Sequence, residues 1–311
     1  MSSDPAKSAA VRTRLTDAHL HVWQLDASEY AWLRAAPEHL RAHVDEAEAL
    51  AAIEQLGADR VVLVQADDTQ SDTRRLLDLA SRWEGCRSGA LRADVVGWMD
   101  LTEPALVHES LTDPARESRL VGVRQLIHDD PDPGILDRPA VADSLDLIAA
   151  AGLAFDVPDA FPRHMVQVGR VAQEHPSLRV VLDHLGKPPL GEADGMRWWA
   201  REIEALAEIG SVFFKISGLA TSGDGYFTAD PVVGDVVGFL LDLAGPQRCL
   251  FGSDWPIAPR SRLMRDGAIP LRDHIVRTFP ECADQILHGT AERVYRRREG
   301  PEVVSAACPV A

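Results

Sequence analysis

The sequence is poor in cysteine and contains no long apolar run. Its four cysteines, among 311 residues, are scattered without any C-x-x-C pairing, which is typical of a protein from a reducing compartment. No segment approaches the run of about 18 apolar residues that spans a bilayer. Residues 1–15 also lack the apolar stretch of a secretory signal peptide, so we expect a cytoplasmic protein.

Positive charge is also scarce. The chain has 32 lysine and arginine residues against 48 aspartate and glutamate residues, which gives a formal net charge of −16. Such a surface repels phosphate backbones and anionic membranes, so neither nucleic acid nor a membrane is an expected partner. A local basic pocket for a small anion is compatible with this balance. We therefore expect a small-molecule substrate, and the sequence leaves open whether the chain forms a homo-oligomer.

Short β-branched runs alternate with longer stretches of helical period, as in an α/β protein. A doubly wound open sheet is the main alternative, but the Gly-rich phosphate turn typical of its first strand is missing. We predict a single-domain (β/α)8 TIM barrel over residues 15–298, flanked by tails at 1–14 and 299–311. The expected strands are 16–23, 60–66, 94–101, 121–127, 153–157, 179–186, 212–218 and 249–256, and the expected helices are 46–57, 71–83, 139–151, 163–174, 196–209 and 231–244.

Polar residues at the strand ends are the candidates for function, because a barrel of this kind carries its active site there. His19 and His21, in the run "TDAHLHVW", are two residues apart, so their side chains point the same way and can converge in the barrel mouth. Asp17 extends this row, and burying three such groups without a function would cost desolvation energy. Helix capping or an ordinary turn is the alternative role at the other strand ends. Those candidates are Gln65, Asp100, Arg124, Asp156, Asp183, His184, Lys215, Ser253 and Asp254.

Five motifs together resemble the amidohydrolase superfamily (amidohydrolase-related family 2). They are "TDAHLHVW", "VGVRQLIHDDPDP", "VVLDHLGKPP", "KISGL" and "LFGSDWP". The resemblance is to the lactonase-like branch, which holds pyrone-dicarboxylate and sugar-acid lactonases, and it runs from about Leu15 to Arg296. Each motif alone is a weak signal, whereas five in the right order are specific. The resemblance implies a TIM-barrel hydrolase of carbohydrate or aromatic catabolism that opens a cyclic ester.

The resemblance also implies a set of metal ligands. In metal-dependent members, two strand-one histidines, a strand-six histidine and a strand-eight aspartate bind the first ion. The matching residues here are His19, His21, His184 and Asp254. The second site of two-metal members is broken, because Arg124 replaces a lysine or glutamate and Asp156 replaces a histidine. We therefore expect one divalent ion, Zn or Mn, or none.

Lactone hydrolysis needs an activated water, a group that polarises the carbonyl and a proton for the leaving alkoxide. Asp254 is the candidate general base and later the acid, because a carboxylate can take a proton from water and return it. His19, His21 and His184 would either bind a metal that polarises the carbonyl or do so themselves. Asp17 is expected to support these residues without being a ligand.

Arg124 is the principal candidate for contacting the substrate. Its planar guanidinium suits bidentate binding of a carboxylate or of ring oxygens. An internal salt bridge to Asp100 or Asp156 would explain it equally well. His128 and Gln125 depart from residues often found in the family at these positions, which leaves the identity of the substrate open.

The remaining pocket candidates are lysines and aromatic residues. Lys187 and Lys215 could contact an anion, with pairing to Asp183 as the alternative. Tyr30 and Trp32 match an aromatic pair of the family and could form a wall of the pocket, with core packing as the alternative. The predicted substrate-binding residues are completed by Gln65, His128 and Trp255.

Two other functions fit the same residues. One is a decarboxylase of the same superfamily, which uses a similar one-metal site but releases CO₂ from an acid. The other is a noncatalytic barrel that binds a small anion and in which the histidines are structural. A hydrolase acting on a lactone is the interpretation that we favour.

Overall fold

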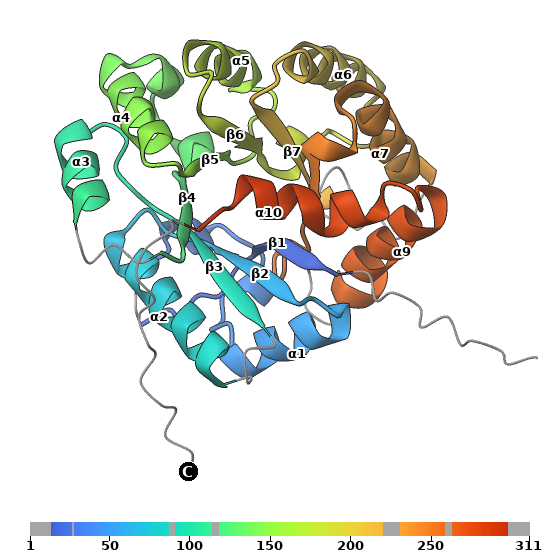
Figure 1. Ribbon diagram of the computed structural model, residues 1–311, viewed down its shortest axis with the longest axis horizontal. Helices are drawn as coiled ribbons and strands as arrows, with labels where there is room; N and C mark the ends of the chain where they lie inside the picture. Colours follow the sequence, from blue (N-terminus) through green and yellow to red (C-terminus); the bar gives the residue numbers. More distant parts are fainter. Residues whose placement is uncertain are drawn as a thin grey trace, which may run out of the picture.

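The barrel consists of eight parallel strands in the order of the sequence. The computed structural model describes residues 14–26, 28–86, 91–113, 118–219, 231–258 and 263–297, so the predicted tails fall almost wholly outside it. An isolated bridge between Leu20 and Trp255 brings the segment after the last strand against the first, and helices surround the ring (Figure 1). The predicted TIM barrel is confirmed. The strands are β1 (Thr16–Leu20), β2 (Arg60–Val64), β3 (Arg92–Gly97), β4 (Leu120–Arg124), β5 (Ala154–Val157), β6 (Arg179–Leu182), β7 (Val212–Ile216) and β8 (Cys249–Phe251).

Helix α1 shows how single residues set the start and the end of a helix. Asp45 accepts a hydrogen bond from the Ala47 N–H at the start of α1, and Gly57 ends it with a φ of 79°. Within the described ranges, no helix combines the length and apolar character needed to cross a membrane. The helices are α1 (Glu46–Leu56), α2 (Gln70–Cys86), α3 (Pro104–Thr112), α4 (Pro139–Ala150), α5 (Met165–Glu174), α6 (Ala193–Ala207), α7 (Pro231–Ala244), α9 (Ile269–Thr278) and α10 (Thr290–Val294).

Most of the strands are shorter at their carboxyl ends than the predicted runs. β1 ends at Leu20 and β8 at Phe251, so His21 and Asp254 lie on the segments that follow. Likewise, β6 ends before His184, whose φ of 54° is incompatible with a strand. His21, His184 and Asp254 therefore occupy the turns that leave the sheet, where a side chain can face the barrel mouth.

The amino-terminal end of the barrel is closed by α10, which lies across the strands in Figure 1. Ala291, Val294 and Tyr295 belong to the same apolar cluster as valines of the barrel interior. Arg179, at the start of β6, donates to the Val294 carbonyl at 2.9 Å, and Arg60, at the start of β2, pairs with Glu292 at 2.8 Å. The barrel is thus packed at this end, and an accessible site has to lie at the other.

Candidate active site

Three histidines and one aspartate converge at the carboxyl ends of the strands. The Nε2 atoms of His19 and His21 are 2.9 Å apart, and the rings of His19 and His184 have centroids 4.5 Å apart. Oδ1 of Asp254 lies 3.6 Å from Nε2 of His19, 3.7 Å from that of His21 and 3.6 Å from that of His184. This oxygen is buried and has no hydrogen-bond partner among the described residues. The four residues that the motifs singled out therefore form one cluster.

The backbone around the cluster adopts uncommon conformations. His184 and Asp254 have φ values of 54° and 59°, in the left-handed region that non-glycine residues rarely occupy. The N–H of Asp254 donates to the carbonyl of His19 at 2.8 Å, which fixes the two segments against each other. Strain of this kind is characteristic of functional sites, where the surrounding structure enforces it.

Gly218, which the sequence analysis did not single out, leaves the space that the cluster needs. Its φ is +60°, and a Cβ at this position would lie 2.5 Å from Nδ1 of His184 and 2.9 Å from Oδ2 of Asp254. Ser217 beside it pairs through Oγ with Nδ1 of His184 at 2.8 Å. The motif "KISGL" was the available signal, because it carries both residues.

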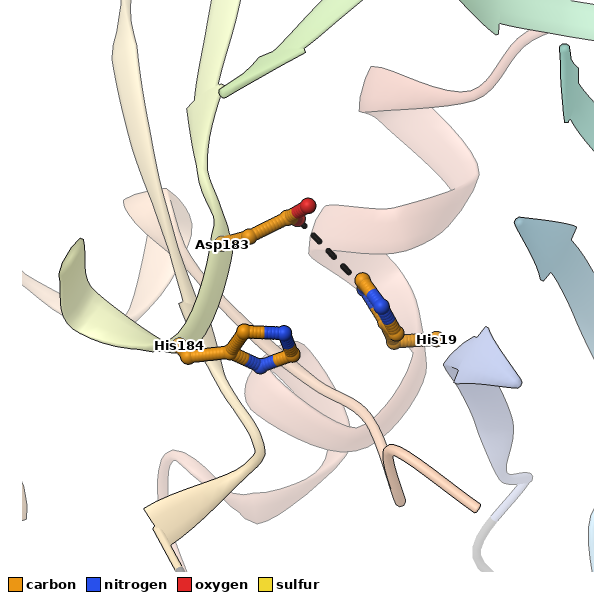
Figure 2. A group of neighbouring side chains, drawn as sticks. All are labelled: His19, Asp183 and His184. Carbon is orange, nitrogen blue, oxygen red and sulfur yellow. Dashed lines mark ion pairs between the residues drawn. The ribbon is translucent and has the colours of Figure 1, made fainter. Parts of the chain in front are cut away.

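A buried group of charges lies beside the histidines. Nζ of Lys215 is 2.7 Å from a carboxylate oxygen of Asp156, 2.7 Å from Oδ1 of Asp183 and 3.1 Å from Nδ1 of His19. Nε of Arg124 lies 3.0 Å from Oδ2 of Asp183. Figure 2 shows Asp183 facing His19, with their ion pair drawn, and His184 beside them. Arg124 therefore does form an internal salt bridge, but its partner is Asp183 and not Asp100 or Asp156.

Burial sets the protonation states in the cluster. It lowers the pKa of His21 to about 3, helped by the charge of Arg124, and lowers the pKa of His19 well below its usual range. Burial also raises the pKa of Asp254. Both strand-one imidazoles are therefore neutral at pH 7, which is the form that binds a metal or accepts a hydrogen bond.

Two overlapping groups of side chains can hold a metal ion, and both include His19. One adds Asp183 and His184, and the other adds His21 and Asp254; within each group the ligand atoms lie within 4.8 Å of one another. Asp183 is already paired with Lys215 and Arg124. The group with Asp254 is therefore the better candidate, and His184 adds a third imidazole to it.

The sequence matches the Amidohydrolase family (Amidohydro_2) over residues 16–297. The chain belongs to this amidohydrolase family. The resemblance inferred from the five motifs is thereby confirmed.

Two relatives with curated names come from the genus Burkholderia. L-fucono-1,5-lactonases of Burkholderia ambifaria and Burkholderia multivorans are each 32% identical to this chain, over 245 and 252 residues. Both alignments cover 78% of this chain, and they cover 80% and 81% of the two relatives. The crystal structure of an amidohydrolase from Burkholderia multivorans with bound Zn is similar at a TM-score of 0.79 and 27% identity, covering 92% of this chain and 100% of that one.

The cluster of this amidohydrolase opens into a cavity of about 320 Å³. Of the predicted substrate-binding residues, Trp32, Arg124, His128 and Lys187 line it. Asp159 lines it as well and was not among the candidates. The other lining residues are His21, Ala35, Ala36, Pro37, Leu40, Ala66, Leu126, His184, Asp254 and Ile257.

Four predicted substrate-binding residues are absent from this lining. Tyr30 is fully buried and its hydroxyl donates to Asp72 at 2.8 Å. Nε2 of Gln65 donates to the carbonyl of Arg124 at 3.2 Å, so Gln65 helps to position Arg124, which lines the cavity. Lys215 lies in the buried charge group described above. Trp255 is 3% exposed and follows Asp254. A substrate-binding role for these four residues stays a prediction, and their absence from the cavity lining argues against it.

Asp17 joins the first and last strands of the barrel. One of its carboxylate oxygens accepts hydrogen bonds from the N–H of Ser253 at 2.7 Å and from the N–H of His19 at 3.2 Å. Burial raises its pKa to about 6, which these hydrogen bonds and others partly oppose. Asp17 is in neither metal-binding group, so its position agrees with the expected supporting role.

The ion pair between Asp159 and Lys187 should make stability depend on pH. Although burial opposes it, Lys187 at 2.9 Å lowers the pKa of Asp159 from 3.8 to about 2. A folded-state pKa below the unfolded value gives stability that is present above pH 3.8 and is lost as the pH falls through about 2. We expect the advantage of the wild type over Asp159→Asn in the free energy of unfolding to shrink by about 2 kcal/mol between pH 6 and pH 2.

Urea denaturation at a series of pH values measures this difference. Asp242→Asn, at an exposed position on α7, is the matched control and should leave the free energy of unfolding unchanged. An advantage over Asp159→Asn that stays constant down to pH 2 would contradict the prediction.

Proposed function

We propose that this amidohydrolase is a lactonase that hydrolyses an uncharged sugar-acid lactone. The observation that carries the proposal is Oδ1 of Asp254, which has no hydrogen-bond partner in the described part of the chain and lies among three imidazoles on a residue that lines the cavity. The identity of 32% to two L-fucono-1,5-lactonases supports the choice of a cyclic ester as substrate.

In the proposed reaction, Asp254 takes a proton from a water molecule as the water oxygen adds to the lactone carbonyl carbon. The resulting oxyanion is stabilised by N–H donors that line the cavity, among which Arg124 and Lys187 carry positive charge. When the ring C–O bond breaks, Asp254 returns the proton to the leaving oxygen. The product is an open-chain hydroxy acid, whose ionisation at neutral pH releases one proton.

The cluster also fits a single divalent ion. Three imidazole Nε2 atoms and one carboxylate oxygen are donors that Zn²⁺ prefers, and the buried Oδ1 of Asp254 has no other partner among the described residues. His19, His21, His184 and Asp254 would hold the ion. When bound there, the ion supplies Lewis-acid polarisation of the ester carbonyl. The amidohydrolase of known structure with bound Zn supports this part of the proposal.

Charge pairing in the cavity favours an uncharged substrate over a pyrone dicarboxylate. Arg124 is paired with Asp183 at 3.0 Å, and Lys187 is paired with Asp159 at 2.9 Å. A dicarboxylate would have to break these pairs and would also face Asp159 and Asp254. The hydroxyl groups of a sugar lactone can instead donate to the same carboxylates.

A pH-indicator assay against aldonolactones and pyrone dicarboxylates tests the proposal. We expect enzyme-dependent acid release from one or more sugar-acid lactones, above the spontaneous hydrolysis measured with Asp254→Asn. Faster turnover of a pyrone dicarboxylate would overturn the proposed substrate class. Release of CO₂ from an aromatic acid, without acid release from any lactone, would overturn the lactonase proposal itself.

A further inference from the structure

Nδ1 of His19 lies between a hydrogen-bond donor and an acceptor. Nζ of Lys215 is 3.1 Å away, and Oδ1 of Asp183 is 3.4 Å away. An ammonium group has three N–H bonds and cannot accept a hydrogen bond. Lys215 has three partners, which are Asp156, Asp183 and His19. Lys215 donates hydrogen bonds to Asp156 and His19 and forms an ion pair with Asp183, and the bond to His19 requires the lone pair of its Nδ1.

The hydrogen bonds of His21 lead independently to the same tautomer of His19. Nδ1 of His21 is 2.9 Å from the carbonyl oxygen of Val64, so this nitrogen carries the proton of the neutral ring. Nε2 of His21 is then an acceptor. Because it lies 2.9 Å from Nε2 of His19, the hydrogen between them has to belong to His19. Both neighbours of His19 therefore place its proton on Nε2.

We propose that Lys215 is a positioning residue that holds His19 in the Nε2–H tautomer and thereby weakens divalent metal binding at the cluster. The inference rests on the proposed role of His19 as a ligand. A metal binds the Nε2 lone pair, so the proton has to leave this atom and move to Nδ1, where Asp183 is the acceptor. Lys215 then gives up its hydrogen bond to His19. Lys215 therefore favours the metal-free form of the site, and Asp183 favours the metal-bound form.

The positive charge of Lys215 also opposes the binding of a metal cation, apart from its hydrogen bond to His19. Lys187 serves as the control for this effect of charge. Lys187 lines the cavity, acts electrostatically on Asp254 and is paired with Asp159. Unlike Lys215, it makes no hydrogen bond to a histidine of the cluster among the described residues; its hydrogen bond goes to Asp159. Lys187→Met removes one positive charge from the site and leaves the hydrogen bonds of His19 in place.

The first experiment measures Zn²⁺ affinity by competition with a chromophoric chelator, using metal-free wild-type protein, Lys215→Met and Lys187→Met. We expect Lys215→Met to bind Zn²⁺ about tenfold or more tightly than Lys187→Met does, because one hydrogen bond to a charged group no longer opposes the metal-bound tautomer. Equal affinities of the two variants, or weaker binding by Lys215→Met, would overturn the proposal.

The second experiment requires no substitution of Lys215, so it can test the proposal even if the Lys215→Met variant fails to fold. Two-bond ¹⁵N–¹H correlation spectra of the metal-free wild-type protein identify the protonated nitrogen of each imidazole, and loss of signals in His19→Gln assigns His19. We expect protonated Nε2 in His19 and protonated Nδ1 in His21. Protonated Nδ1 in His19 would overturn the proposal. Neither readout involves turnover, so a negative lactone assay would refute the proposed function and leave this inference standing.

Discussion

Replacing Asp254 by asparagine is expected to lower kcat for lactone hydrolysis by about 10²–10⁴-fold. The amide keeps the size of the side chain but can neither take a proton from water nor return it to the leaving oxygen. Oδ1 of Asp254 has no hydrogen-bond partner among the described residues, so the substitution breaks no hydrogen bond at this atom. Initial rates at saturating lactone, corrected for spontaneous hydrolysis, measure the effect.

Asp146→Asn is the matched control for this substitution. Asp146 lies at the surface, where its carboxylate pairs with His175 at 2.7 Å, and it is remote in sequence from every residue of the cluster. We expect its kcat to equal that of the wild type. An Asp254→Asn protein that is folded and keeps more than about a tenth of the wild-type kcat would refute the role of Asp254 as general base.

Gly218→Ala is expected to lower kcat/KM by about 10²-fold or more, although no reacting group is changed. The added Cβ would lie 2.5 Å from Nδ1 of His184 and 2.9 Å from Oδ2 of Asp254, so at least one of them has to move. The φ of +60° adds a backbone cost of about 1–2 kcal/mol for any residue with a Cβ. Steady-state kinetics, together with thermal unfolding, separate the displaced site from a destabilised fold.

Gly210→Ala provides the comparison, because a Cβ at Gly210 would meet no atom within 4 Å. We expect this variant to keep the wild-type kcat/KM. Wild-type kinetics in Gly218→Ala would show that the cluster tolerates the displacement and that the close packing around His184 is not required for turnover.

The fold was predictable from the sequence because its signals are local. Each strand overlaps one of the short runs predicted from the sequence, and residues two apart on a strand share a face, so His19 and His21 were expected to converge. The salt-bridge partner of Arg124, Asp183, was not predictable in the same way. Asp183 lies on the segment after β6, and only the closed barrel brings it between Arg124 and Lys215.

Gly218 illustrates a second limit. A glycine after a strand is common in α/β proteins, and the motif "KISGL" marks this glycine without showing that two side chains of the cluster need room beside it. The distances from a hypothetical Cβ reveal the difference, and they depend on residues 34 positions before and 36 positions after Gly218 in the chain. Tyr30 and Trp32 show the same limit, because only one of the two aromatic residues lines the cavity.

The closing helix α10 has a consequence for the order of events during protein synthesis. The hydroxyl of Tyr295 donates to Asp156 at 2.7 Å, Asp156 pairs with Lys215, and Lys215 donates to His19. A ribosome makes Tyr295 some 276 residues after His19, so the nascent chain contains the histidines of the cluster long before the last partner of the charge group has been synthesised. The site can therefore reach its final geometry only after nearly the whole polypeptide has been synthesised.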